Sequence, residues 1–265
     1  MLIDGRSSGS LTSGIADAAA PRTDVQFVCV SHRPAIFDAF VGNNPNVSPS
    51  RLHKYDNSVE NIGIASRYND FIETTMADGW VVFMHHDMSF DEPLEPLLAQ
   101  APKDSIYGVV GTLATPGRRF LHLGRKSRFR AELRRGRWSQ IRVMGKIKCR
   151  DDLSPTGWVG EIASGFPVVD TVDCCCVIVH SDLIRRHQLR FNSEFPWHFY
   201  SEEFSLRSRR EHGILTRVVQ VDCGHYGHGA TDKEFTRAQN ALIDEYGRTG
   251  FSSTCYIPPL SLIHI

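Results

Sequence analysis

The chain has 265 residues, 41% hydrophobic and 23% charged, a composition that excludes a disordered protein and predicts one sizeable globular core. Its 30 basic and 30 acidic residues cancel, so the overall charge gives no indication of a nucleic-acid partner. No window offers the roughly 18 uncharged apolar residues that a membrane span needs, and seven cysteines without a Cys-x-x-Cys pair indicate reduced, buried thiols. We therefore expect a cytoplasmic protein.

Three regions are predicted along the chain. Residues 1–22 are rich in Ser, Gly and Ala, lack the apolar centre of a signal peptide, and are typical of a disordered leader. Residues 23–250 are expected to form one domain, and residues 251–265 give no clear indication of secondary structure. Inside the domain, residues 118–150 carry thirteen basic residues and a single acidic one, with poor periodicity, so we predict a loop or excursion there.

The hydrophobic pattern predicts alternating strands and helices from the start of the domain. The expected order is a strand at 25–31, a helix after Pro34, a strand at 51–58, a helix at 59–79 and a strand at 80–84. The later elements are a short helix in 92–100, a strand at 106–114, a strand running into a helix at 168–184, a helix at 200–213, a strand at 214–222 and a helix at 233–247. This order predicts a parallel sheet covered on both faces, with ligand sites at the carboxyl ends of its strands.

The strand at 80–84 is followed by an unusual polar cluster in "VVFMHHD", where His85, His86 and Asp87 stand in place of a Gly, Asn or Pro turn. Alternation along a strand would put His85 and Asp87 on one side and turn His86 away from them. The alternative is a strand-end cluster that only forms hydrogen bonds with neighbouring loops.

Several segments, in order, resemble the family-2 glycosyltransferases with a GT-A fold, in particular the branch in which His-x-Asp replaces Asp-x-Asp. The matching segments are the strand at 25–31, "YDNS", "ASRYND", "VVFMHHD", "VDTVDCCCVIVHSDLI" and "LRFNSEFPWHFYSEEFSLRSRREHG". The resemblance covers about residues 24–230 and implies a Rossmann-like α/β/α sandwich around a mostly parallel sheet. It also implies transfer of a sugar, with inversion, from a nucleotide-diphosphate sugar to a hydroxyl of an acceptor saccharide or glycoconjugate.

The resemblance implies a divalent metal that bridges the leaving diphosphate. Asp87 is the expected metal ligand, and His85 is expected at the metal or the nucleotide. The family often supplies a late His to the metal or diphosphate, and His225 and His228 are both candidates. We favour His228, because its flanking glycines allow a close backbone approach. The cofactor is predicted to be Mn²⁺ or Mg²⁺, with imidazole ligation favouring Mn²⁺.

The family's inverting members use a carboxylate to remove the acceptor's proton. Glu203 aligns with the catalytic Asp of the family, and Glu202 with the residue before it; either could instead favour a helix N-terminus through the helix dipole. Asp173 could contact an acceptor hydroxyl, or it could be a buried carboxylate held by backbone amides.

The nucleotide is expected over the first strands. The resemblance assigns contacts to Ser31, Asp56, Arg67 and Asn69, besides His85. The alternative for Asp56 is an ordinary Asx turn with the two residues that follow it.

Three functions stay open at this point. They are a metal-dependent glycosyltransferase, a sugar nucleotidyltransferase, and a non-catalytic nucleotide-sugar-binding protein of the same fold. The nucleotidyltransferase usually carries a Gly-rich loop after its first strand, which "SHRPAIF" lacks. The basic excursion could attract the donor, hold an anionic acceptor or make peripheral contact with a membrane, or its charges could simply be solvated.

Overall fold

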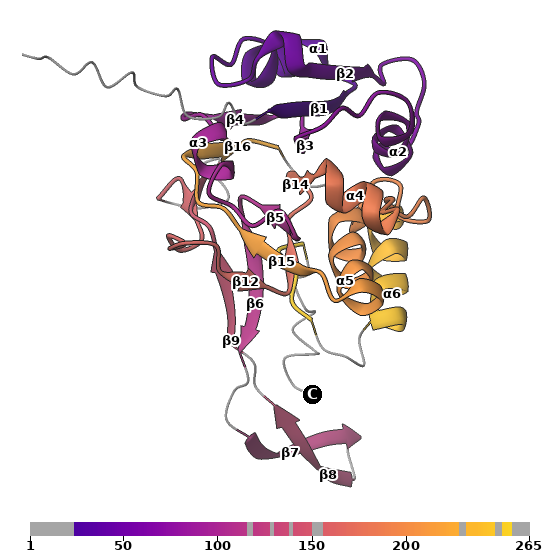
Figure 1. Ribbon diagram of the computed structural model, residues 1–265. Helices are drawn as coiled ribbons and strands as arrows, with labels where there is room; N and C mark the ends of the chain where they lie inside the picture. Colours follow the sequence, from indigo (N-terminus) through magenta and orange to yellow (C-terminus); the bar gives the residue numbers. More distant parts are fainter. Residues whose placement is uncertain are drawn as a thin grey trace, which may run out of the picture.

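A seven-stranded, mostly parallel sheet forms the centre of the computed structural model (Figure 1). Its strand order is β12-β15-β5-β14-β3-β1-β2. Five strands share one direction: β1 (Val25–Ser31), β2 (Leu52–Asp56), β3 (Trp80–His85), β5 (Ser105–Gly108) and β15 (Leu215–Val218). β14 (Cys176–His180) and β12 (Val168–Val169) run antiparallel to their neighbours. The predicted α/β class with a mostly parallel sheet is therefore confirmed.

The structure describes residues 24–115, 119–127, 130–137, 140–149, 156–227, 232–246 and 251–255. The leader predicted at 1–22 lies outside these residues. Within them, no helix is both long and apolar enough to cross a membrane.

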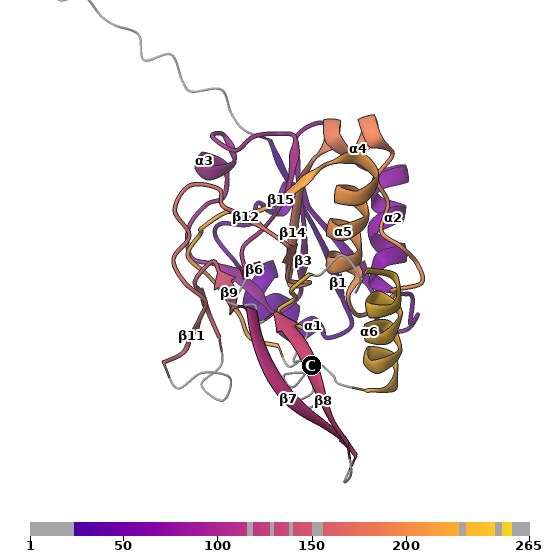
Figure 2. The same cartoon turned by 90° about the horizontal axis from the view of Figure 1, so that it is seen from below.

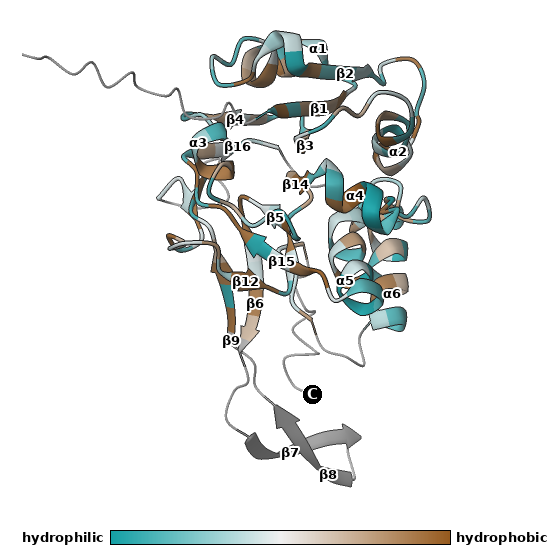
Figure 3. Ribbon diagram, in the orientation of Figure 1, coloured by the Kyte–Doolittle hydropathy of each residue, from teal (hydrophilic) through white to brown (hydrophobic). Residues whose placement is uncertain are grey.

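Side chains of the central strands are buried on both faces of the sheet. Along β1, Val28 and Val30 pack into one hydrophobic cluster while Phe27 and Cys29 pack into the other, because successive side chains of a strand point to opposite faces. All of β1 is buried, which explains its continuous apolar run. Figure 3 shows that β1 is largely hydrophobic, whereas much of α4 is hydrophilic.

Helices cover both faces of this sheet, as predicted. One face carries α2 (Ile64–Thr74), α4 (Ser181–His187), α5 (Tyr200–His212) and α6 (Lys233–Tyr246), which lie together in Figure 2. The other face carries α1 (Pro34–Phe37), the π-helical η1 (Asp38–Gly42) and α3 (Glu95–Leu98). A 3₁₀ turn, η2 (Pro49–Arg51), leads into β2.

Two of these helices show how local sequence sets their ends. α5 ends at the predicted Gly213, which adopts φ 69°, a left-handed conformation that favours glycine. α2 is shorter than predicted and begins after Gly63. A Cβ on Gly63 would lie 2.6 Å from Cβ of Pro196, so this glycine permits a close approach between the start of α2 and the segment before α5.

The basic region at 118–150 was predicted as a loop or excursion, and its described part is largely strand. β7 (Arg119–Ser127) and β8 (Arg130–Arg137) pair antiparallel. β9 (Gln140–Met144) pairs with β6 (Gly111–Thr115), which also pairs with β13 (Thr171–Val172). A further small sheet has the order β11-β10-β16-β4, formed by β11 (Trp158–Val159), β10 (Ile147–Lys148), β16 (Cys223–His225) and β4 (Met88–Phe90). β9 and β10 pair with segments outside this region, which periodicity does not record, whereas β7 and β8 pair with each other as neighbours in sequence.

Candidate functional site

A cavity of about 950 Å³ opens at the carboxyl ends of β1, β2 and β3. This is the edge at which sheets of this kind bind ligands. Its walls are largely apolar and aromatic, with Ile36, Phe40, Ile64, Trp197 and Tyr226 among the lining side chains. The rings of Phe40 and Tyr226 stack with centroids 4.8 Å apart and planes inclined by 18°.

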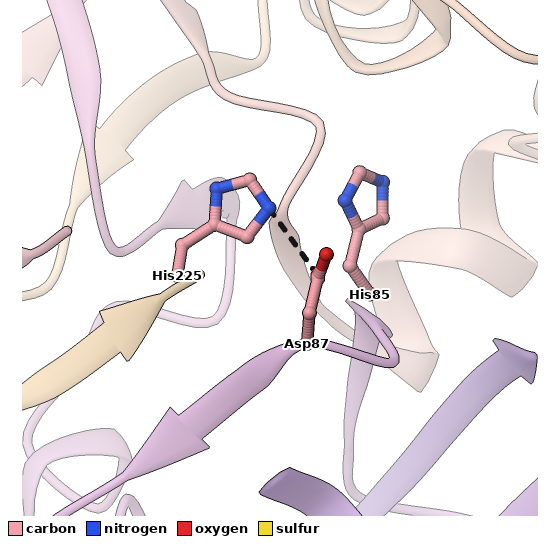
Figure 4. A group of neighbouring side chains, drawn as sticks. All are labelled: His85, Asp87 and His225. Atoms are coloured by element: carbon pink, nitrogen blue, oxygen red, sulfur yellow. Dashed lines mark ion pairs between the residues drawn. The ribbon is translucent and has the colours of Figure 1, made fainter. Parts of the chain in front are cut away.

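Three potential metal ligands meet at the cavity (Figure 4): His85 at the end of β3, Asp87 in the turn that follows, and His225 at the end of β16. One ligand atom from each lies within 4.8 Å of the other two. The antiparallel pairing of β4 with β16 places Met88 opposite His225 and so brings the late strand beside Asp87. We call this group the His85–Asp87–His225 cluster.

His85 is oriented by Tyr200, at the start of α5. Its Nε2 lies 2.7 Å from the hydroxyl of Tyr200, and that hydroxyl donates a hydrogen bond of 2.8 Å to the carbonyl of Cys174. Since the single hydroxyl proton is used there, Nε2 of His85 must donate to Tyr200, which leaves a lone pair on Nδ1. Burial, reinforced by the nearby charge of His225, lowers the pKa of His85 to about 4, so its imidazole is neutral near pH 7. Figure 4 shows one ring nitrogen of His85 on the side of Asp87 and His225.

Asp87 and His225 form an ion pair, with 3.3 Å between Oδ1 and Nε2. Burial alone would raise the pKa of Asp87, but the contact with His225 dominates and holds that pKa well below its usual range. Burial would likewise lower the pKa of His225, and Asp87 outweighs it, so that this pKa is raised. Apart from this ion pair, Asp87 Oδ1 is buried and has no hydrogen-bond partner. This anionic oxygen is therefore open to a cation as a further partner.

Gly227 gives Asp87 the room it needs. A Cβ at position 227 would overlap Oδ2 of Asp87, so only glycine fits beside this carboxylate. The donor set of one carboxylate and two imidazoles fits a divalent ion such as Mn²⁺, because one ligand atom from each lies within 4.8 Å of the others. His225 would release the Nε2 proton of its ion pair with Asp87 to act as a ligand.

The predicted metal ligands Asp87 and His85 are thus brought together, and the third member of the group is His225. His228, the favoured late histidine, lies outside the described residues. His86, expected to point away from His85 and Asp87, is not a member of their cluster, and it lines the cavity with its ring 4.9 Å from that of His32. His86 and Asp87 lie in a turn, where strand alternation no longer applies.

Ser31, Asp56 and Asn69, three of the four predicted nucleotide-binding residues, use their side chains in contacts within the fold. Ser31 is buried, and its hydroxyl donates to the carbonyl of Arg33. Asp56 is exposed and accepts from the Ser58 amide, the Asx turn considered as its alternative. Asn69 bonds to both the amide and the carbonyl of Phe191, away from the cavity.

Arg67 bonds to Asn57, a cavity-lining residue that sequence reasoning passed over. Nε of Arg67 donates to Oδ1 of Asn57 at 3.2 Å, while Nδ2 of Asn57 donates to the carbonyl of Ile62 at 2.6 Å. Arg33 also lines the cavity. A basic residue directly after the first strand was visible in "SHRP", but nothing in that segment showed that the side chain faces a ligand.

Glu203 and Glu202 begin α5 and are both buried. Glu203 pairs with Arg207 at 2.8 Å, one helical turn later. Glu202 accepts from Ser201 at 2.7 Å and Ser253 at 2.6 Å. Burial, aided by the charge of Asp173, raises the pKa of Glu202 even though these two hydroxyls oppose the shift.

Asp173 lies between these glutamates and the metal ligands. Its Oδ1 accepts from the amide of Cys175 at 2.8 Å, and its Oδ2 accepts from the hydroxyl of Thr254. An oxygen of Asp173 lies within 4.8 Å of a ring nitrogen of His225. Burial raises the pKa of Asp173, but the charge of His225 together with the hydrogen bonds from Thr254 and Cys175 outweighs it, so the pKa is lowered. Among the described residues that line the cavity, Asp87 is the only carboxylate, so Asp173, Glu202 and Glu203 all lie behind its surface.

Comparison with known proteins supports the fold. No protein-family model matches the chain, and no curated protein matches its sequence. The solved structure of GalNAc-T7 with UDP, GalNAc and Mn²⁺ aligns with a TM-score of 0.52 at 6% identity, over 84% of this chain and 48% of that chain. The chain therefore spans about half the length of that protein. HddC from Yersinia pseudotuberculosis aligns with a TM-score of 0.31 at 7% identity, over 84% of this chain and 78% of that one. The likeness to GalNAc-T7 confirms the predicted GT-A-like fold and, at this identity, shows the fold alone.

Proposed function

We propose that this chain is a metal-dependent glycosyltransferase that moves a sugar from a nucleotide-diphosphate sugar to an acceptor hydroxyl, with inversion. The observation that carries the proposal is the His85–Asp87–His225 cluster at the carboxyl edge of the parallel strands, beside a cavity of about 950 Å³. That volume lies within the range of about 300–1,000 Å³ typical of small-molecule sites.

The cluster's residues would hold Mn²⁺ or Mg²⁺, and such an ion neutralises charge on a leaving diphosphate. His85 presents Nδ1, because Tyr200 occupies its other nitrogen. Asp87 contributes the buried oxygen that lacks a hydrogen-bond partner. Because the GalNAc-T7 structure contains UDP and Mn²⁺, a uridine nucleotide and Mn²⁺ are the first probes to use.

The donor would lie in the cavity between charged and aromatic walls. Arg33 can pair with a phosphate oxygen, and the stacked pair of Phe40 and Tyr226 offers an apolar wall for the nucleoside. Asn57 can also contact the nucleoside, because its amide has a second N–H and a second lone pair besides those bonded to Ile62 and Arg67.

For the general base we propose Glu202 in place of Glu203. Glu203 is engaged by the guanidinium of Arg207, which favours a structural role. The carboxylate of Glu202 accepts hydrogen bonds from the hydroxyls of Ser201 and Ser253 and from the thiol of Cys174. It therefore lies on the side of α5 that faces Cys174. Its raised pKa is the direction expected of a carboxylate that must take up a proton.

Two measurements test the proposal. Calorimetric titration with UDP and with GDP, with and without Mn²⁺, should show tight binding that a chelator abolishes. Incubation with a panel of nucleotide sugars should release nucleoside diphosphate in a Mn²⁺-dependent way. Release of a nucleoside triphosphate upon adding pyrophosphate would instead identify a nucleotidyltransferase.

One observation favours a second candidate, a non-catalytic nucleotide-sugar-binding protein. The cavity-lining residues that the structure describes include no carboxylate besides Asp87. Binding of UDP with Mn²⁺, without release of nucleoside diphosphate from any donor in the panel, would identify this candidate.

A further inference from the structure

The segment at residues 251–255, which we call the strap, packs against the side of the sheet behind the cavity. Ser252 and Ser253 are buried, and Thr254 and Cys255 are half-buried. The hydroxyl of Thr171 donates to the carbonyl of Ser252 at 2.6 Å. This contact fixes the middle of the strap against β13.

Each of the three consecutive hydroxyl side chains of the strap donates to a different carboxylate. Ser252 donates to Asp170 at 2.8 Å and Ser253 to Glu202 at 2.6 Å, and Thr254 donates to Asp173. In the described part of the chain, no Lys or Arg forms an ion pair with Glu202 or Asp173. Neutral groups are therefore the donors to these two buried carboxylates: hydroxyls, together with the amide of Cys175 at Asp173 and the thiol of Cys174 at Glu202.

The pair formed by Asp173 and Glu202 lies next to the metal cluster. An oxygen of Asp173 is within 4.8 Å of His225, which in turn belongs to the His85–Asp87–His225 cluster. A hydroxyl bound to Asp173 thus sits one side chain away from the metal ligands. In a glycosyltransferase, the hydroxyl of the acceptor must reach this neighbourhood.

A segment that only completed a hydrophobic core would contribute apolar side chains. The strap contributes Phe251 to the core, yet its next three side chains all bind carboxylates. A saccharide presents the same chemistry, because several neighbouring hydroxyls can donate to carboxylates. The strap and a saccharide would therefore compete for Asp173 and Glu202.

We propose that Asp173 and Glu202 form a hydroxyl-binding acceptor subsite and that the strap occupies it through Ser253 and Thr254 until a saccharide replaces it. This inference rests on the proposed function for its biological meaning. Its test, however, uses sugar binding and strap release, which do not require a donor or turnover.

The test compares the wild type with Ser253→Ala/Thr254→Val, which removes both hydroxyls. Strap release is measured as the rate at which iodoacetamide alkylates Cys255, quantified by mass spectrometry. Loss of one hydrogen bond to a charged group raises the equilibrium constant for strap opening by about tenfold. We therefore expect the alkylation rate of Cys255 to increase by at least tenfold. Ser253→Thr/Thr254→Ser is the matched control, which keeps both hydroxyls and should react like the wild type.

Sugar binding is measured by saturation-transfer NMR with a panel of methyl hexopyranosides. Signals should appear or grow in the hydroxyl-free variant compared with the wild type. Faster alkylation without new sugar binding would overturn the proposal and leave the strap as a structural segment. Unchanged alkylation would overturn it as well.

If the double variant unfolds, as judged by circular dichroism, Thr254→Val alone decides the question, because Thr254 lies at the half-buried end of the strap. Donor binding is the separate readout for the proposed function. A chain that gains sugar binding on strap release but never binds a nucleotide supports the subsite and refutes the transferase.

Discussion

The two sides of this site differ in how their carboxylates are satisfied. On the cavity side, the buried Oδ1 of Asp87 has an ion pair with His225 but no hydrogen-bond partner. On the opposite side, Asp173 and Glu202 have donors on both oxygens, and the strap supplies one donor to each. The first side keeps an anionic oxygen that is open to a cation, while the second is already complete with the chain's own donors. A ligand therefore adds to one side and must replace something on the other.

The largest effect is expected from Asp87→Ala, which removes the only carboxylate of the His85–Asp87–His225 cluster. Mn²⁺-dependent nucleotide binding should be abolished, because two imidazoles alone leave the cation without an anionic ligand. Titration calorimetry with UDP, with and without Mn²⁺, measures this. His86→Ala is the control and should have a mild effect. Wild-type affinity in the Asp87 variant, unchanged by Mn²⁺, would refute the metal site.

Glu202→Gln tests the side of the site opposite to Asp87. It keeps size and hydrogen bonding but removes basicity, so the turnover rate at saturating donor should fall by about 10²–10⁴-fold while donor binding survives.

Glu203→Gln is the matched partner of that variant. It should keep activity but lower the free energy of unfolding, by up to about 3–5 kcal/mol, because it leaves Arg207 without its buried anion. Thermal or urea unfolding measures that loss. An inactive Glu203→Gln beside an active Glu202→Gln would return the base to the position that the sequence alignment favoured.

Tyr200→Phe sharpens the comparison, because Tyr200 links both sides through His85 and Cys174. Without the hydroxyl, His85 loses the partner that fixes its ring, and Mn²⁺ affinity should fall by about 10–100-fold. Tyr107→Phe, which removes a hydroxyl that donates to Pro102 at 2.6 Å, is the control and should leave Mn²⁺ affinity unchanged. Equal Mn²⁺ affinities in the two variants would show that Tyr200 does not orient the ligand.

The smallest expected effect is the change of turnover and stability with pH. Burial raises the pKa of Glu202, so its ionised, basic form appears only above the ordinary pH range for a glutamate. Turnover should rise with pH through this raised pKa, and Glu202→Gln should lose that limb of the profile. Stability should change in the opposite sense: the contribution of Glu202 is fully present below its unfolded pKa and is lost as pH rises through its folded pKa. Parallel pH series of turnover and thermal unfolding check both trends.

Much of the fold was predictable from sequence because its central strands are continuous apolar runs. β1 matches its predicted bounds, and β3 extends the predicted strand by only one residue. β9 and β10 were not predictable, because they depend on backbone pairing with the distant β6 and β16. β7 and β8 pair with each other, and their many basic residues hid this pairing from the hydrophobic pattern.

The site was predictable only where its residues are neighbours in sequence. His85 and Asp87 lie two positions apart, and the end of a buried strand placed them together. Three further features depend on contacts between distant segments. They are the presence of His225 in the cluster, the hydroxyl of Tyr200 that orients His85, and the strap hydroxyls that donate to the carboxylates. No periodicity or spacing in a single sequence reports those contacts.

The hydrogen bond between His85 and Tyr200 joins residues 115 positions apart, and the one between Thr254 and Asp173 joins residues 81 positions apart. Contacts of such long sequence separation form slowly, because the loop they close must be ordered first. The parallel core of β1, β2 and β3 can be synthesised and paired long before α5 and β16 leave the ribosome. During synthesis, His85 and Asp87 therefore precede His225 and the hydroxyl of Tyr200 by more than a hundred residues. A metal bound at the proposed site would stabilise the completed fold, because the cluster does not exist before these late segments are in place.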